Sequence, residues 1–166
     1  MSLVTIIIIC STLFSSCQEQ KMEEKFDWSG TLSAPQEYPI EVYKGSLKTS
    51  DFTQHFKNWG IINTGWGNQG GTMIVGPDKK AIPATLEISW LSFAENKFYE
   101  GKFDLPKEKL TALFKQGFID PITKEKETYK NIVIGLAPKG TVVVWLLSTG
   151  IQTFSPPSTG YGHDWI

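Results

Sequence analysis

Hydrophobic and polar residues alternate along several stretches of the chain, which is the pattern of β-strands with one buried face. The clearest stretch is residues 83–90, where every second position is apolar and a turn is expected at residues 95–96. Residues 39–47 and 97–103 are predicted strands of the same kind. The positions of the clearest strand that are expected to face a core are Leu86, Ile88 and Trp90.

Residues 128–136 and 141–147 predict a β-hairpin. The residues between them, Ala137 to Gly140, include a proline and a glycine in positions that suit a tight turn. The second of these strands is apolar on both faces, which is typical of a central strand covered on two sides.

One main helix is predicted over about residues 105–117. Asp104 is placed to cap its first turn, Pro106 falls where a missing N–H is harmless, and Gly117 suits its C-terminal end. With the strands, this helix predicts an α+β, mainly β fold: an antiparallel β-sheet or sandwich-like domain with one helix. The apolar stripe of the helix consists of Leu110, Leu113 and Phe114.

Two segments are less regular. Residues 51–59 carry aromatic residues and a histidine at helical spacing, so a short helix or a loop is expected. The glycine-rich residues 65–76 are expected to form a long loop around a short strand at 72–75. Residues 65–70 match the dinucleotide-binding pattern G-x-G-x-x-G, but no helix is predicted after them, so no dinucleotide cofactor is predicted.

The first 16 residues are predicted to be a lipoprotein signal peptide. Residues 3–14 form an apolar run shorter than the about 20 residues that cross a bilayer, and Ser15, Ser16 and Cys17 follow it. This order resembles a lipobox, which implies cleavage before Cys17 and acyl chains on that cysteine. An ordinary cleaved signal peptide and a buried apolar strand are the alternatives.

Residues 17–27 are predicted to be the lipidated cysteine and a flexible polar tether, and a single β-rich domain is expected over residues 28–166. Gln18 follows the cysteine, so no aspartate there signals retention in the inner membrane. The lipobox resemblance therefore implies a protein anchored by lipid to the outer membrane, on its periplasmic face or at the cell surface.

Charge and cysteine content exclude several classes of function. All 16 basic residues are lysines and the formal net charge is −1, so no nucleic-acid partner is expected. Cys10 and Cys17 both precede the expected domain, which leaves it without disulfides or cysteine zinc ligands. His55 and His163 are the only histidines, and no metal site is predicted from them.

Glu87 and Glu95 are the first candidates for the carboxylate pair that glycoside hydrolysis requires, although solvated acids on an exposed sheet face explain them more simply. No catalytic residue is therefore predicted. Trp59, Trp66 and Trp90 are candidates to line a groove for sugar or peptide, and Trp66, flanked by glycines, is the least suited to a core. The candidate binding residues are Trp59, Trp66, Glu87 and Glu95.

Four short motifs along the body of the chain stand out together. They are Ala34-Pro35 to Tyr38-Pro39, Trp90-Leu-Ser-Phe-Ala-Glu95-Asn-Lys-Phe-Tyr99, Asp104-Leu-Pro106 and Gly135-Leu-Ala-Pro-Lys-Gly140-Thr-Val-Val-Val-Trp145-Leu. In these motifs the chain resembles one family of bacterial envelope lipoproteins, catalogued as domain of unknown function 2931. The resemblance covers most of residues 28–150 and implies a lipoprotein with a β-rich domain, but no activity and no catalytic residues.

The expected anchor and the lack of a convincing catalytic set favour a non-enzymatic binding module for a protein or peptide in the cell envelope. An immunity protein that caps a toxin would be one specific form. A protein that binds or hydrolyses envelope glycans is the first alternative, and a structural envelope lipoprotein is the second.

Overall fold

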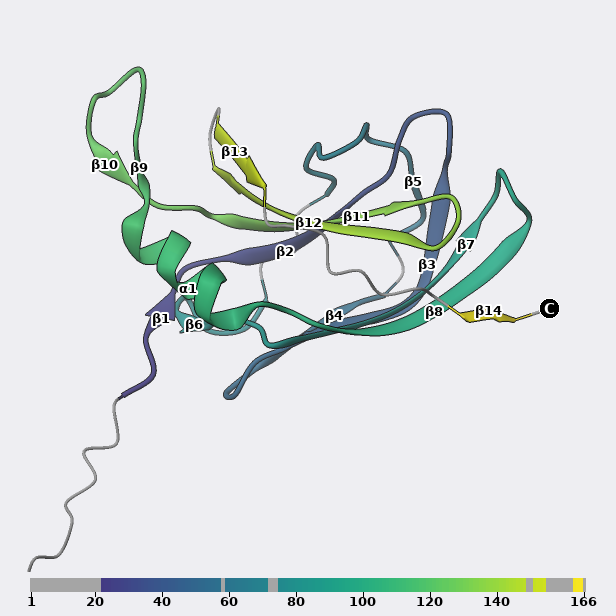
Figure 1. Ribbon diagram of the computed structural model, residues 1–166, viewed down its shortest axis with the longest axis horizontal. Helices are drawn as coiled ribbons and strands as arrows, with labels where there is room; N and C mark the ends of the chain where they lie inside the picture. Colours follow the sequence, from purple (N-terminus) through teal and green to yellow (C-terminus); the bar gives the residue numbers. More distant parts are fainter. Residues whose placement is uncertain (1–21, 58, 72–74, 149–150, 155–162, 166) are drawn as a thin grey trace, which may run out of the picture.

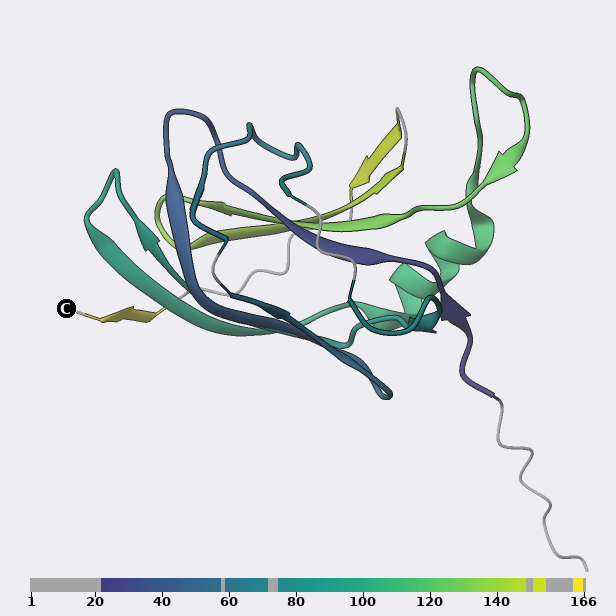
Figure 2. The ribbon, with the colours of Figure 1, turned by 180° about the vertical axis from the view of Figure 1, so that it is seen from behind.

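The computed structural model describes residues 22–57, 59–71, 75–148, 151–154 and 163–165, the last two ranges by their backbone alone. Figures 1 and 2 show two β-sheets that lie face to face, with one helix at one end of the molecule. The fold is therefore mainly β with a single helix among the described residues, as the sequence predicts.

The larger sheet has six strands, and all of its strand pairs are antiparallel. Its order is β14-β8-β7-β3-β4, and the short β5 pairs with β3. The predicted strands at 39–47, 83–90 and 97–103 correspond to β3, β7 and β8. The six strands are β3 (Ile40–Lys48), β4 (Thr53–Phe56), β5 (Ile61–Ile62), β7 (Thr85–Ser92), β8 (Lys97–Asp104) and β14 (His163–Trp165).

The smaller sheet has four strands in the order β13-β12-β11-β2. The predicted hairpin is confirmed as β11 and β12, and five residues of β12 in succession are buried. β2 pairs with β11 in parallel, which the sequence did not predict. The four strands are β2 (Ser29–Ser33), β11 (Asn131–Ala137), β12 (Thr141–Ser148) and β13 (Ile151–Phe154).

The segment before β2 is held against the domain. Its strand β1 (Lys25–Phe26) pairs with β6 (Lys80–Ala81). The expectation of a flexible tether up to residue 27 is therefore wrong for this strand, because the phenyl ring of Phe26 packs 5.3 Å from that of Phe114. Ion pairs surround the strand: Glu23 with Lys107, Glu24 with Lys115, Lys25 with Asp51, and Asp27 with Lys130.

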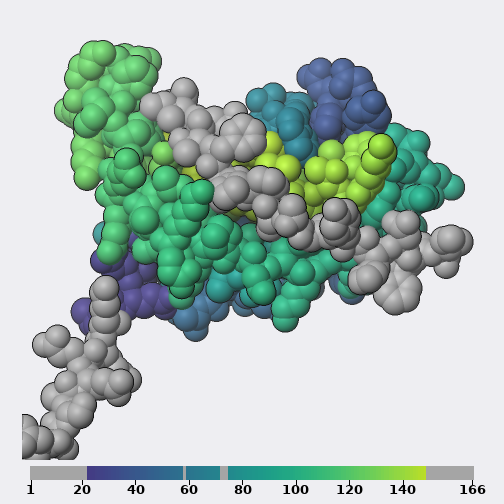
Figure 3. Space-filling model, viewed as in Figure 1, coloured from purple at the N-terminus to yellow at the C-terminus, as the bar shows by residue number. Residues whose placement is uncertain are grey.

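The helix α1 (Lys107–Gln116) begins three residues later than Asp104. Asp104 ends β8 instead, and Pro106 occupies the N-cap position without a side-chain hydrogen bond, so the predicted cap is wrong. Gly117 ends the helix as predicted, with φ at 57° and its N–H bonded to the carbonyl of Leu113. Beyond α1, β9 (Phe118–Ile119) and β10 (Lys126–Glu127) form a small hairpin that projects at the same end of the molecule (Figure 3).

Residues 53–56 form a strand, β4, where a short helix or loop was expected. The helical spacing of aromatic residues is incidental, because burial follows every second residue: Gln54 and Phe56 are buried while His55 is exposed. The predicted strand at 72–75 falls mostly outside the described residues. The loop at residues 65–70 runs beside β2, with Gly65 and Gly70 donating to the carbonyls of Ala34 and Leu32.

Candidate functional site

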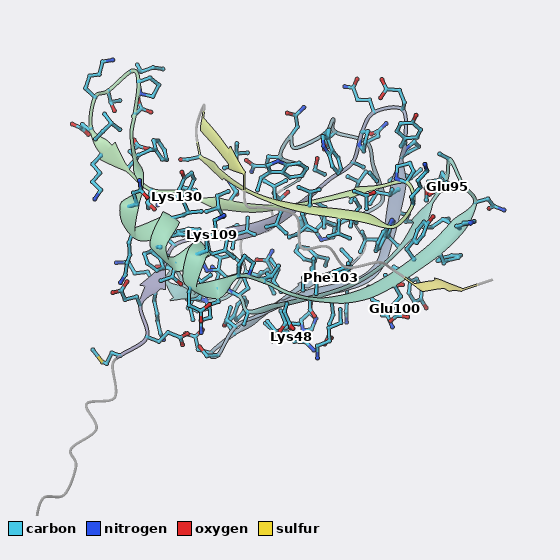
Figure 4. All side chains as sticks on the ribbon, in the orientation of Figure 1. Lys48, Glu95, Glu100, Phe103, Lys109 and Lys130 are labelled. Atoms are coloured by element: carbon cyan, nitrogen blue, oxygen red, sulfur yellow. The ribbon has the colours of Figure 1, made fainter. Side chains whose placement is uncertain are left out.

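The outer face of the larger sheet is hollowed. This outer-face hollow has a volume of about 610 Å³ and lies across β3, β7 and β8 beside the end of β4. Figure 4 shows the contrast between the two faces, with Phe103 directed toward the opposite sheet and Lys48 and Glu100 directed away from it. The residues that line the hollow are Lys44, Gly45, Ser46, His55, Lys57, Glu87, Ile88, Glu100, Gly101 and Lys102.

Strand register brings these polar side chains together. Ser46 pairs with His55 on one side and with Glu87 on the other, and Glu87 pairs with Lys102. Side chains directly across antiparallel strands lie about 5 Å apart, so these four form a continuous polar row. A bulge between Val42 and Lys44 sets which residues of β3 face outward in this part of the strand.

Lysines dominate the charge of the hollow. Glu87 pairs with Lys48 at 2.5 Å and with Lys102 at 3.5 Å, and Glu100 pairs with Lys44 at 2.7 Å. The hydrogen bond from Lys48 is the main cause that holds the pKa of Glu87 below its ordinary value. These two carboxylates face three lysines.

A fourth lysine, Lys57, has no ion-pair partner within the described part of the chain. The hollow and its rim therefore carry an excess of positive charge, which suits an anionic ligand.

A second hollow of about 390 Å³ adjoins the first at the edge of the sheet, along β4. His55 and Lys57 line both hollows, so together they form a continuous depression from the outer face to the sheet edge. The residues that line this edge hollow are Phe52, Thr53, His55, Lys57, Val75 and Gly76.

Glu87 and Glu95 lie in different places and do not form a carboxylate pair. A strand rises about 3.3 Å per residue, so the part of β7 from Glu87 to its end at Ser92 measures about 16 Å. Glu95 lies farther on, in the β7–β8 turn. The two carboxyls of a glycosidase are about 5 to 9 Å apart, a distance that this arrangement exceeds.

Glu95 joins the two sheets. Its two carboxylate oxygens each accept the backbone N–H of Lys139, in the β11–β12 turn, at 3.1 Å, and its carboxylate also accepts the hydroxyl of Tyr99 at 3.0 Å. Burial raises the pKa of Glu95, but these hydrogen bonds outweigh burial and keep the pKa below its ordinary value. Glu95 is thus a structural contact at the end of the molecule opposite α1 (Figure 4).

Trp59, Trp66 and Trp90, the three candidate tryptophans, do not line one groove. Trp59 is half-buried and packs edge-on against Phe56 at 5.6 Å, next to the main core. Trp66 is 41% exposed and packs edge-on against Trp145 at 4.8 Å, in a separate cluster on the smaller sheet. Trp90 is fully buried. Cys17 and the side chain of His163 lie outside the described residues.

Sequence reasoning missed the lysines of the outer-face hollow as a group. Lys44, Lys57 and Lys102 come from three different segments, and only strand register brings them together. Alternation of apolar and polar residues within each strand would have assigned Lys44 and Lys102 to a solvent-facing side. It does not predict which residues of the neighbouring strands lie beside them.

The part of the chain that the structure covers shows neither a metal-binding group of side chains nor a membrane-spanning helix. The described residues contain no group of three or more histidine, cysteine or acidic side chains placed to hold a metal ion. No helix in the described residues is long and apolar enough to cross a bilayer.

Comparison with known proteins identifies the family. The family model described as "Protein of unknown function (DUF2931)" matches residues 15–164, so the chain belongs to this family. No curated protein and no solved structure matches the chain. The family description assigns no activity, so the outer-face hollow and its neighbour at the sheet edge are the features from which function is inferred.

Proposed function

We propose that this protein is a non-enzymatic binding module, anchored by lipid on Cys17 to the bacterial outer membrane, that binds an acidic segment of a protein or peptide in the cell envelope. The observation that carries the binding role is the lysine-rich outer-face hollow. A volume of about 610 Å³ is large enough for several side chains, and the positive charge selects for acidic ones.

The arrangement of charges supports binding rather than catalysis. Glu87 is held by two lysines, and the lowered pKa of its carboxyl keeps it ionised at neutral pH, so it cannot serve as a general acid there. Glu95 is engaged in contacts between the sheets. An acidic ligand would balance the positive charge by which the four lysines of the hollow and its rim exceed Glu87 and Glu100.

The anchor is supported by the lipobox-like order of residues around Cys17 and by the position of β1. Seven residues lie between Cys17 and Lys25, and eight steps of at most about 3.8 Å between successive Cα atoms would place the start of β1 within about 30 Å of the lipid. Metabolic labelling with palmitate tests this part: the label should appear in the full chain and disappear in Cys17→Ala.

The binding role is tested by affinity purification of the lipidated protein from detergent-solubilised envelopes. A partner should co-purify in stoichiometric amount and should be lost with Lys57→Glu/Lys102→Glu. The matched control is Lys109→Glu/Lys126→Glu, which changes the net charge equally at exposed sites outside both hollows. Figure 4 places Lys109 at the helical end, away from Glu100. A partner that both double variants retain, or no partner at all, would contradict the proposal.

A further inference from the structure

The strand β4 forms one edge of the larger sheet. It pairs with β3 on one side, and no strand in the described ranges pairs with its other side. The β3–β4 turn is closed by a hydrogen bond from the N–H of Thr49 to the carbonyl of Phe52. This bond fixes which residues of β4 direct their backbone N–H and C=O groups toward β3, because hydrogen-bonded and non-bonded residue pairs alternate along an antiparallel ladder.

Counting from that bond, the pairs of Lys48 with Thr53 and of Ser46 with His55 are non-bonded. The carbonyl of Lys48 indeed turns away from β4 and accepts the N–H of Ala84 at 2.9 Å. Thr53 and His55 therefore direct their backbone N–H and C=O groups away from β3, toward the open edge. No described residue bonds to these four backbone groups, so within the described part of the chain they are open to a further strand.

The edge hollow lies on this side of β4. Thr53 and His55 line it from the strand and Lys57 from the residue after the strand end, and Val75 and Gly76 also line it. An added strand would lie about 4.8 Å from β4, within this hollow. Its outward side chains would stand next to His55 and Lys57, and no acidic side chain among the described residues forms an ion pair with Lys57.

The inward side chains of an added strand would meet a different environment. Gln54 and Phe56 point from β4 into the core, so alternate positions of the added strand would lie at the border of the apolar interior. The edge therefore fits an extended segment in which acidic residues alternate with apolar residues.

We infer that the acidic partner binds by strand addition: an extended peptide of alternating acidic and apolar residues pairs with the edge of β4 that has no partner strand in the described ranges, with its acidic side chains directed toward His55 and Lys57. This inference rests on the proposed function and specifies how the partner is held. Backbone hydrogen bonds to Thr53 and His55 would supply affinity, and the lysines would supply selectivity for acidic side chains.

The test uses the full chain in detergent and a capped ten-residue peptide of alternating glutamate and valine. Hydrogen exchange at the amides of Thr53 and His55 should slow by about tenfold or more when the peptide binds, because these amides become bonded. The amides of Gln54 and Phe56, which already face β3, serve as internal controls. A peptide with N-methyl groups at alternate residues should bind at least about tenfold more weakly, since it lacks the backbone donors.

Side-chain selectivity is tested with Lys57→Glu and with the same peptide carrying lysine in place of glutamate. Each change should weaken binding by about tenfold, whereas Lys109→Glu should leave it unchanged. Binding that ignores N-methylation and leaves exchange at Thr53 and His55 unaltered would overturn strand addition.

The affinity purification separates failure of this inference from failure of the proposed function. A co-purified partner that depends on Lys57 and Lys102, yet leaves exchange at Thr53 and His55 unaltered, would overturn strand addition alone. The absence of both a partner and peptide binding would overturn both proposals.

Discussion

The side-chain amide of Gln54, in β4, forms two hydrogen bonds of 2.8 Å with the backbone of Gly30, in β2. It accepts the N–H of Gly30 and donates to its carbonyl, as a neighbouring strand would. The contact joins the edges of the two sheets within the core, where Gln54 is 1% exposed. Glycine gives this contact room, because a Cβ on Gly30 would lie 2.7 Å from the Cδ1 of Leu47 and would require that side chain to shift.

Gln54→Leu removes this bridge and leaves both backbone groups of Gly30 buried without partners. Because an unsatisfied buried polar group costs about 1–3 kcal/mol, we expect the free energy of unfolding to fall by about 3 kcal/mol. Urea denaturation measures the change. His55→Ala, at the exposed neighbouring position, should change stability by less than about 0.5 kcal/mol. If Gln54→Leu lowers the free energy of unfolding as little as His55→Ala does, the bridge adds no stability.

Asp51 should make the stability of the protein depend on acid pH. Lys25, at 2.7 Å, and the hydroxyl of Thr49 lower the pKa of Asp51 to about 2. The folded-state pKa lies below the unfolded value, so the stabilisation is complete above pH about 4 and is lost as pH falls toward about 2. Asp51→Asn should remove this part of the pH dependence. The free energy of unfolding is measured by denaturation at several pH values in this range. If it falls equally with pH in the original protein and in Asp51→Asn, the expectation is contradicted.

Glu95→Ala should loosen the end of the molecule where the two hairpin turns meet. Loss of the bonds to Lys139 and Tyr99 is expected to lower the free energy of unfolding by about 1–2 kcal/mol. Hydrogen exchange at the Lys139 amide should accelerate as well. Glu41→Ala, which removes an exposed carboxylate of β3, is the control and should leave that amide unchanged.

Trp66→Ala tests whether the exposed tryptophan acts in structure or in ligand binding. Its ring packs edge-on against Trp145, and a Cβ on Gly135 would lie 2.2 Å from the ring of Trp145 and 3.0 Å from that of Trp66. The loss of this aromatic contact should lower the free energy of unfolding by about 1–2 kcal/mol. Partner capture from envelopes should be unaffected. Loss of capture in a protein of unchanged stability would instead move the ligand site to the smaller sheet.

Local features of the fold could be predicted from the sequence. Period-two alternation identified β3, β7 and β8, and the Pro138 to Gly140 turn identified the β11–β12 hairpin. The end of α1 at Gly117 followed from the freedom of glycine at positive φ. In each case the determining interactions are between residues close in sequence.

Features that depend on distant partners could not be predicted. β4 was missed because its inward residues include Gln54, a polar side chain whose burial depends on hydrogen bonds to the distant backbone of Gly30. β1 and β6 are two residues each: β1 is held by the packing of Phe26 on α1 and by ion pairs, and β6 accepts a hydrogen bond from Trp28 at Ala81. The outer-face hollow depends on the register of four strands, which no single stretch of sequence encodes.

The parallel pairing of β2 with β11 has a consequence for how the chain folds. Asp27 and Lys130, which form an ion pair beside these strands, are 103 positions apart. A chain that emerges from its N-terminus first therefore presents β2 long before its partner exists. Contacts of such large sequence separation slow folding, because the intervening loop loses entropy before the pairing contributes stability. The domain is expected to fold only after nearly all of its chain has emerged, on the slow timescale of proteins with high contact order.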